Sequence, residues 1–235
     1  MNKKENIKQT RTSPDIGILH EDDQILVINK PAGLLSQEDH TGDPDLLTLC
    51  KEYLQRESGN SSEPFLGLVQ RIDRPVSGLM VLAKTRGAAA ELSRLMRNGA
   101  IQKFYLAVVE GTPPPNGVLV HHLLKSAELP IVTVVPEGNR DAKRAELHFV
   151  RLGVDPASGH SLVRIRLVTG RKHQIRAQFS EAGYPLAGDT RYGGLALTEN
   201  RIALHAAELR FPHPAGGEQV RYRSEPEPIY PWSCF

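Results

Sequence analysis

The chain has 235 residues, of which 40% are hydrophobic and 24% charged, with 29 Lys and Arg against 27 Asp and Glu. This composition is typical of a globular protein and excludes a disordered chain, a collagen and a disulfide scaffold. No apolar run reaches the roughly 20 residues of a membrane span, and the start lacks a signal-peptide core. We therefore expect a cytoplasmic protein that binds no membrane. Its two cysteines match no metal-binding spacing, which predicts reduced thiols.

The charges are distributed unevenly along the sequence. Residues 20–63 carry 3 basic and 10 acidic side chains, giving −7, whereas residues 64–176 carry 17 and 8, giving +9. A basic segment of this kind favours a surface that faces a polyanion. A scattered set of solvated charges is the alternative interpretation.

A polar tail and a β-hairpin open the chain. Residues 1–15 are polar, and we expect a flexible tail there. The segment 16–30 holds two strand-like runs around an acidic turn, which predicts a hairpin. Pro31 and Gly33 then force a loop.

Two helices and a buried strand follow. Asp43 as N-cap and Pro44 as first residue predict the start of a helix, because apolar side chains then recur at helical spacing. The all-apolar run 78–83 predicts a buried central strand. A second helix over 86–98 is expected to end at Gly99.

The second half of the sequence is dominated by strands. Residues 102–110 alternate as a strand, residues 112–117 predict a rigid surface turn, and His121 and His122 are expected at the surface or in a turn rather than as metal ligands. A third helix is predicted to begin near Lys172 or His173 and to end at Gly183. Further strand-like runs lie at 131–135, 145–152, 161–168, 202–209 and 219–222.

The order of these elements predicts the fold class. Strands outnumber helices, and several follow one another without a helix between them. This pattern favours an α+β fold, with one domain over residues 16–235 and a central, mostly antiparallel mixed sheet flanked by helices. The sequence also lacks a Gly-rich phosphate loop, a metal-ligand spacing and a nucleophile elbow, so we expect neither cofactor nor metal.

The stretch RIDRPVSGL is the first candidate site. Asp73 lies between Arg71 and Arg74 in a loop that enters the buried strand, and nearby cations favour an ionised carboxylate. The alternative role is structural, with Asp73 capping the turn or pairing with an arginine.

The second candidate site is the stretch from residue 159 to residue 193. Gly170 ends a strand, and Arg171, Lys172 and His173 follow at the start of a helix. Arg176 lies beside the apolar stripe of that helix and is therefore expected to reach into a neighbouring cleft. A helix N-terminus preceded by basic residues is a natural phosphate or nucleic-acid site, and a solvated basic face is the alternative.

Together with two further stretches, these sites resemble the RluA-type family of RNA pseudouridine synthases. The resemblance covers roughly residues 17–215 and rests on ILHEDDQILVINKPAGLLS, RIDRPVSGLMVLAKT, KFYLAVVEG and LVTGRKHQIRAQFSEAGYPLAGDTRYGG, with LHAAELRFPHP after them. It implies a central, mostly antiparallel sheet with the active site in a cleft across it. The implied activity is the isomerisation of specific uridines in ribosomal or transfer RNA, without a cofactor.

The resemblance also implies residue roles. Asp73 is similar to the catalytic aspartate, Tyr105 to the tyrosine that packs against the target base, and Arg176 to the arginine that pairs with the catalytic carboxylate. Tyr105 is a candidate catalytic residue too, since it could assist removal of the C5 proton, although a phenol with an ordinary pKa near 10 is a poor base at neutral pH. Arg71 is similar to an arginine of RNA binding and base extrusion. The basic residues near these positions are expected to contact RNA: Arg71, Arg74, Lys103, Arg171, Lys172 and His173.

The chain departs from the family pattern at three positions. It has Gln70 where the family usually has His, Ile72 for Leu and Val76 for Thr. None of these removes a functional group assigned above, although the role of Gln70 is left open. About fifteen residues precede the first strand, so the N-terminal accessory RNA-binding domain of many members is expected to be missing.

Several alternatives stay open at this point. The sequence does not distinguish three actions of Asp73: attack at C1′, removal of the 2′ hydrogen, and attack on the base. A non-catalytic RNA-binding or chaperone protein with the same basic cleft is the alternative function, and a carboxylate-pair glycosidase lacks a second acid near the first. We expect a monomer without an obligate protein partner.

Overall fold

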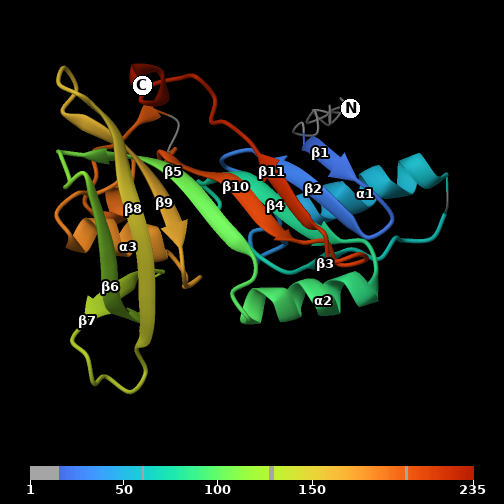
Figure 1. The fold of residues 1–235 in the computed structure, drawn as a ribbon. Helices are drawn as coiled ribbons and strands as arrows, with labels where there is room; N and C mark the ends of the chain where they lie inside the picture. Colours follow the sequence, from blue (N-terminus) through green and yellow to red (C-terminus); the bar gives the residue numbers. More distant parts are fainter. Residues whose placement is uncertain (1–15, 60, 127–129, 199–200) are drawn as a thin grey trace, which may run out of the picture.

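The computed structural model describes residues 16–59, 61–126, 130–198 and 201–235, so the expected tail 1–15 lies outside the described residues. They form one large sheet with three α-helices packed on it (Figure 1). The strands are β1 (Gly17–Glu21), β2 (Ile25–Lys30), β3 (Gly67–Leu68), β4 (Ser77–Ala83), β5 (Gln102–Glu110), β6 (Asn116–Lys125), β7 (Val132–Val135), β8 (Lys143–Asp155), β9 (His160–Leu167), β10 (Leu204–Pro212) and β11 (Gln219–Arg223). The helices are α1 (Leu46–Ser58), α2 (Arg86–Arg97) and α3 (Gln174–Glu181), with 3₁₀ turns η1 (Thr190–Tyr192) and η3 (Trp232–Cys234).

The sheet runs in the order β1-β2-β4-β10-β5-β9-β8-β6-β7, with β11 paired to β10 and β3 to β4. Every described strand pair is antiparallel except β4 with β10, which are parallel and join at two positions, Ser77 with His205 and Gly78 with Ala206. The predicted α+β class and mostly antiparallel mixed sheet are therefore confirmed. The late strand β10 lies in the middle of the sheet and joins its two halves (Figure 1).

The first half of the sheet is covered on both faces. Met80 and Leu82 of β4 pack in one core with α1, while the alternate residues Leu79 and Val81 pack in a second core with α2. All four are fully buried. This two-sided burial explains why the β4 sequence is apolar throughout rather than alternating.

The second half of the sheet is covered on one face by α3. Phe179 of α3 packs edge-on against Phe149 of β8, with ring centroids 5.4 Å apart, and Ile175 joins the same core. The helix begins after His173 and ends before Gly183, as the sequence predicts. Among the described residues, no helix is long and apolar enough to cross a membrane.

Two predictions about individual elements are wrong. Asp43 is not the N-cap of α1: Asp45 is, with its carboxylate accepting from the amide of Thr48 at 3.1 Å. Leu35 pairs with Asp45 in a β-bridge, which keeps the chain extended up to Leu46 and delays the helix.

Residues 116–125 form the strand β6 instead of continuing the turn at 112–117, so His121 and His122 lie on a strand. This strand was missed because adjacent histidines interrupt the alternation of its apolar residues. Its pairing comes from β7 and β8. The other differences are shifts of boundaries, chiefly the extension of β8 and β10, and the short strand β3.

Candidate active site

The loop that carries Asp73 connects β3 to β4 and is held by the buried Lys30 of β2. The Lys30 ammonium donates hydrogen bonds to the carbonyls of Leu34 (2.7 Å) and Arg74 (3.2 Å). Burial lowers the pKa of Lys30 to about 7, although the nearby Asp73 charge opposes the shift. The amide of Gly33 donates to the same Arg74 carbonyl at 2.7 Å. Two donors therefore fix the backbone immediately after Asp73.

A buried arginine joins two carboxylates at this site. Arg176 of α3 is 3% exposed, and its Nε and Nη2 donate to the two oxygens of Asp189 at 2.6 and 2.8 Å. Its Nη1 donates to Asp73 Oδ2 at 3.1 Å. Burial opposes the charge, but the hydrogen bonds and charges of Asp189 and Asp73 raise the pKa of Arg176. A permanent cation is thus aimed at Asp73 across 103 residues of sequence.

His173 lies against the same carboxylate. Its Nε2 is 3.7 Å from Asp73 Oδ2, and its Nδ1 is 2.9 Å from the hydroxyl of Tyr192. That hydroxyl accepts the amide of Val132 at 2.8 Å, which leaves its proton for Nδ1 and favours the tautomer with Nε2–H toward Asp73. Burial lowers the pKa of His173 to about 4, so the ring is neutral near neutral pH. The residue needs a left-handed backbone, φ 51°, to take this position.

Asp73 lines a small cavity of about 70 Å³ together with Tyr105 of β5. The remaining wall is mixed: Val76, Leu167 and Leu204 are among its apolar residues, and it also holds polar and charged side chains such as Arg71 and Gln174. Burial and the Asp73 charge raise the pKa of Tyr105 well above its ordinary value, so the phenol keeps its proton. Tyr105 therefore presents a protonated aromatic ring beside the carboxylate.

A groove of about 680 Å³ leads to this cavity, and Arg71 and Asp73 line both. Arg171 and Lys172 line the groove, as does Lys125 at the end of β6. Arg74 also faces the groove, but it is tied down by Asp43 (2.8 Å) and by the carbonyl of Gly33 (3.0 Å). The basic side chains of three distant segments thus meet along one approach to Asp73.

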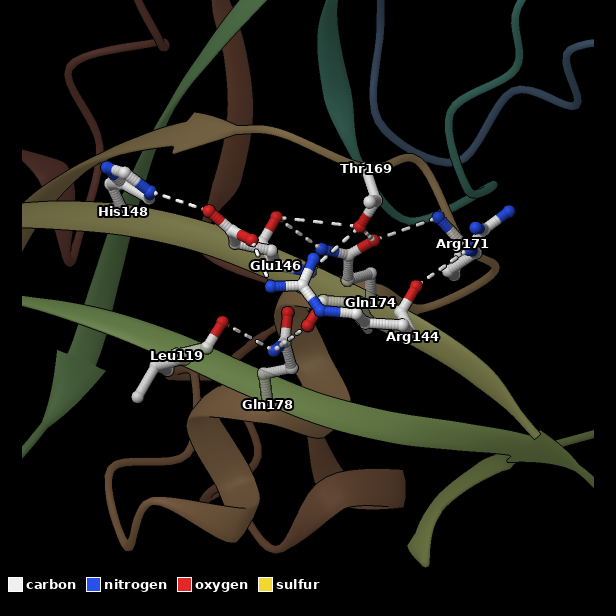
Figure 2. A network of polar contacts seen from close by, with 9 residues as sticks. Leu119, Arg144, Glu146, His148, Thr169, Arg171, Gln174 and Gln178 are labelled. Carbon is white, nitrogen blue, oxygen red and sulfur yellow. Dashed lines mark hydrogen bonds and ion pairs between the residues drawn. The ribbon is translucent and has the colours of Figure 1, made fainter. Parts of the chain in front are cut away.

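A polar network fixes the start of α3 on β8 (Figure 2). The side chain of Gln174 donates to the carbonyl of Glu146 (3.0 Å) and accepts from the Thr169 hydroxyl (2.8 Å) and the Arg171 amide (2.9 Å). One turn later, Gln178 donates to the carbonyl of Leu119 at 3.0 Å. Figure 2 shows both glutamines pointing from α3 into the strands. This anchoring sets the position of Arg176 between them.

The structure brings most of the expected residues together, with one exception. Lys103 is not among the residues that line the cavity or the groove; its ammonium lies 3.7 Å from Met96 Sδ of α2 and beside Gly170 at the edge of the groove. Sequence reasoning missed three residues of the site: Asp189, Tyr192 and Lys125. Asp189 and Tyr192 stand in the quoted GDTRYGG stretch, which was the available signal, whereas Lys125 carried none.

Known proteins resemble this chain over most of its length. A family model described as RNA pseudouridylate synthase matches residues 24–181. Ribosomal large subunit pseudouridine synthase D of Zymomonas mobilis is 37% identical over 223 residues, covering 88% of this chain and 68% of that protein. Ribosomal large subunit pseudouridine synthase C of Escherichia coli is 38% identical over 218 residues, covering 87% and 64%. This chain thus spans about two thirds of the length of these relatives.

A solved structure supports the same fold. Human RNA pseudouridylate synthase domain containing 4 superposes with a TM-score of 0.76 over 93% of this chain and 90% of that one, at 24% identity. The segment matched by the family model runs from β2 to α3 and contains Asp73, Tyr105 and Arg176. The chain belongs to the RNA pseudouridylate synthase family, isomerases that convert uridine in RNA to pseudouridine.

Proposed function

We propose that this protein isomerises uridine in large-subunit ribosomal RNA, with Asp73 as the catalytic carboxylate. The names of the relatives above support this RNA class. The observation that carries the proposal is the pairing of Asp73 with the buried Arg176 at the point where a basic groove meets a small cavity. The substrate is a polyanion, so the protein needs a basic groove to bind it. The reaction takes place at a single nucleoside, so the protein also needs a small cavity.

The reaction breaks the N1–C1′ bond of uridine, turns the base and joins C5 to C1′. It gains and loses no atoms overall, so side chains that hold charge and position suffice. Both contacts of the Asp73 carboxylate fall on Oδ2, and among the described residues Oδ1 has no hydrogen-bond partner. We therefore assign Oδ1 as the oxygen that acts at the ribose, with Arg176 keeping the carboxylate ionised and aimed.

Binding is assigned to the groove and to Tyr105. Extruding a base from a helix costs a few kcal/mol. Stacking on the Tyr105 ring contributes about 1–3 kcal/mol per base, and phosphate contacts of Arg71, Arg171 and Lys172 offset the rest. Because the phenol keeps its proton, its role here is stacking rather than removal of the C5 proton.

Tritium release from RNA labelled at C5 of uridine tests the proposal. Wild-type protein should release tritium from deproteinised large-subunit ribosomal RNA, and Asp73→Asn should release none while binding the RNA as tightly. Asp155→Asn makes the same chemical change at the β8–β9 turn and should retain wild-type release. Turnover by Asp73→Asn would contradict the catalytic assignment. Release from bulk transfer RNA alone would contradict the RNA class.

We also propose that the protein acts in the cytoplasm as a monomer. Light scattering of the protein without RNA should give the mass of one chain, 26.0 kDa. A stable dimer would contradict this.

A further inference from the structure

Five arginines lie together on the face of the sheet opposite the active site. Strand pairing places them side by side, because residues opposite one another in a ladder point to the same face. Arg210 pairs with Arg221, and Arg166 with Phe104. We call this cluster the arginine face; it consists of Arg164 and Arg166 on β9, Arg210 on β10, Arg221 and Arg223 on β11, with Glu208 on β10 and Phe104 on β5.

A β-bulge in β10 creates the arginine face. Ala206 pairs with Tyr105, on the cavity side, but the register then shifts and Glu208 pairs with Phe104. The extra residue reverses the direction of the following side chains. Without the bulge, Glu208 and Arg210 would point toward the other side of the sheet.

The arginine face carries far more positive than negative charge. The carboxylate of Glu208, 7% exposed, pairs with Arg221 at 2.5 Å and Arg164 at 3.0 Å, and Arg210 also contacts it. A single carboxylate balances one of the five guanidinium groups, which leaves +4. Arg166 is exposed and makes no ion pair with any described residue. Such a charge excess calls for an external anion.

The guanidinium groups are also held in fixed positions. Arg164 and Arg210 stack over the Phe104 ring, at 4.7 and 4.9 Å from its centroid. Their side chains nevertheless remain 41% and 37% exposed, and that of Arg223 is 65% exposed. Less entropy is lost when an anion binds donors that are already oriented.

We propose that the arginine face is a second binding site for the RNA backbone, separate from the cleft. This inference rests on the proposed function, since it assumes an RNA substrate large enough to contact both sides of the sheet. Guanidinium groups match phosphate in a bidentate geometry, and their spread over β9, β10 and β11 suits a row of phosphates rather than one small anion. Contacts to phosphates fix position but carry no sequence information, so the contribution of the arginine face is affinity without sequence preference.

Charge reversal at the two least engaged arginines tests the site. Arg166→Glu/Arg223→Glu removes only the most distant partner of Glu208, Arg223 at 3.7 Å, and keeps Arg164, Arg210 and Arg221 around that carboxylate, so the variant should fold normally. Lys51→Gln/Arg56→Gln and Lys51→Glu/Arg56→Glu on α1 are controls, the second with the same charge change. The probe is a fluorescein-labelled RNA hairpin of random sequence, measured by anisotropy across a salt series. Loss of two phosphate contacts should weaken binding about tenfold and flatten the slope of log K against log[salt] by about 1.4–1.8.

The outcomes separate this inference from the proposed function. Unchanged affinity and slope in Arg166→Glu/Arg223→Glu, or an equal loss in the α1 charge-reversal control, would overturn the second site. Two other results would also overturn it. The first is a wild-type dimer that becomes a monomer in this variant; the second is a variant that loses binding to an acidic protein while it still binds RNA like wild type. Asp73→Asn should bind the hairpin like wild type. Absence of tritium release by wild type, with the arginine effect intact, would refute the isomerase assignment alone.

Discussion

Replacing Asp189 by asparagine should expose how strongly the site depends on this second carboxylate. Arg176 is 3% exposed and Asp189 1% exposed, so the bidentate pair between them is almost fully removed from water. Breaking a buried pair by removing one partner costs about 3–5 kcal/mol, because a charge is left uncompensated. Asp73 still faces Arg176 at 3.1 Å, which places the expected cost near the lower end, about 3 kcal/mol.

Urea denaturation measures that cost, and a second variant tests its cause. If the uncompensated charge is responsible, Arg176→Gln/Asp189→Asn should be more stable than Asp189→Asn alone, since neither member of the buried pair is then charged. A double variant less stable than the single one would refute this reasoning.

Turnover should respond separately from stability. In Asp189→Asn only one acceptor oxygen remains at residue 189, so the bidentate contact that orients the Arg176 guanidinium is broken and Asp73 is aimed less well. Misplacement by about 1 Å costs on the order of 100-fold in rate. We expect kcat for tritium release to fall by that factor, with KM for RNA nearly unchanged, when the variant is assayed without urea and is folded. A rise in KM alone would contradict a positioning role.

Three further predictions concern other parts of the molecule. Tyr105→Phe should retain most tritium release, because the phenol keeps its proton and the ring still stacks; loss of more than about 100-fold would restore a proton-transfer role. Gly78→Ala should cost at least about 3 kcal/mol in urea denaturation, since its Cβ would lie 2.4 Å from the Ala206 amide nitrogen at φ +117°, whereas Gly87→Ala in α2 should not destabilise the protein. Burial lowers the pKa of His205 to about 4 from 6.5, so the unfolded chain takes up its proton first and the stability present above pH 6.5 is lost as pH falls toward 4. That loss is about 3 kcal/mol, and His205→Gln should remove it from the pH dependence of unfolding; an unchanged dependence would contradict the assignment.

Local patterns were sufficient to predict the elements that bear most of the site. Periodicity placed Arg176 beside the apolar stripe of its helix, and the structure has it reaching from α3 to Asp73. Glycine and proline signals located the loop around Gly33 and the end of α3 at Gly183. These features depend on neighbours in sequence, so they are readable from sequence.

Features set by distant partners were not readable. The true N-cap of α1, Asp45, is decided by a bridge to Leu35, and β6 by its pairing with β8. Asp189 lies in an irregular segment without periodicity, so the GDTRYGG stretch marked its position but not its bidentate contact with Arg176. Lys103 lies on the strand β5 as predicted, but its ammonium lies between Met96 of α2 and Gly170, a contact that depends on distant segments. In each case tertiary contacts decided the outcome.

The central place of β10 dictates the order in which the protein can be assembled. During synthesis, β1, β2 and β4 emerge with the Asp73 loop, and β5 to β9 with α3 emerge later, but no described strand pair links these groups until β10 inserts between β4 and β5. Contacts that close so late in the chain make folding slow and cooperative. We therefore expect Asp73 and Arg176 to stay apart until β10 has docked between the two groups, so that the site becomes competent only at this late step.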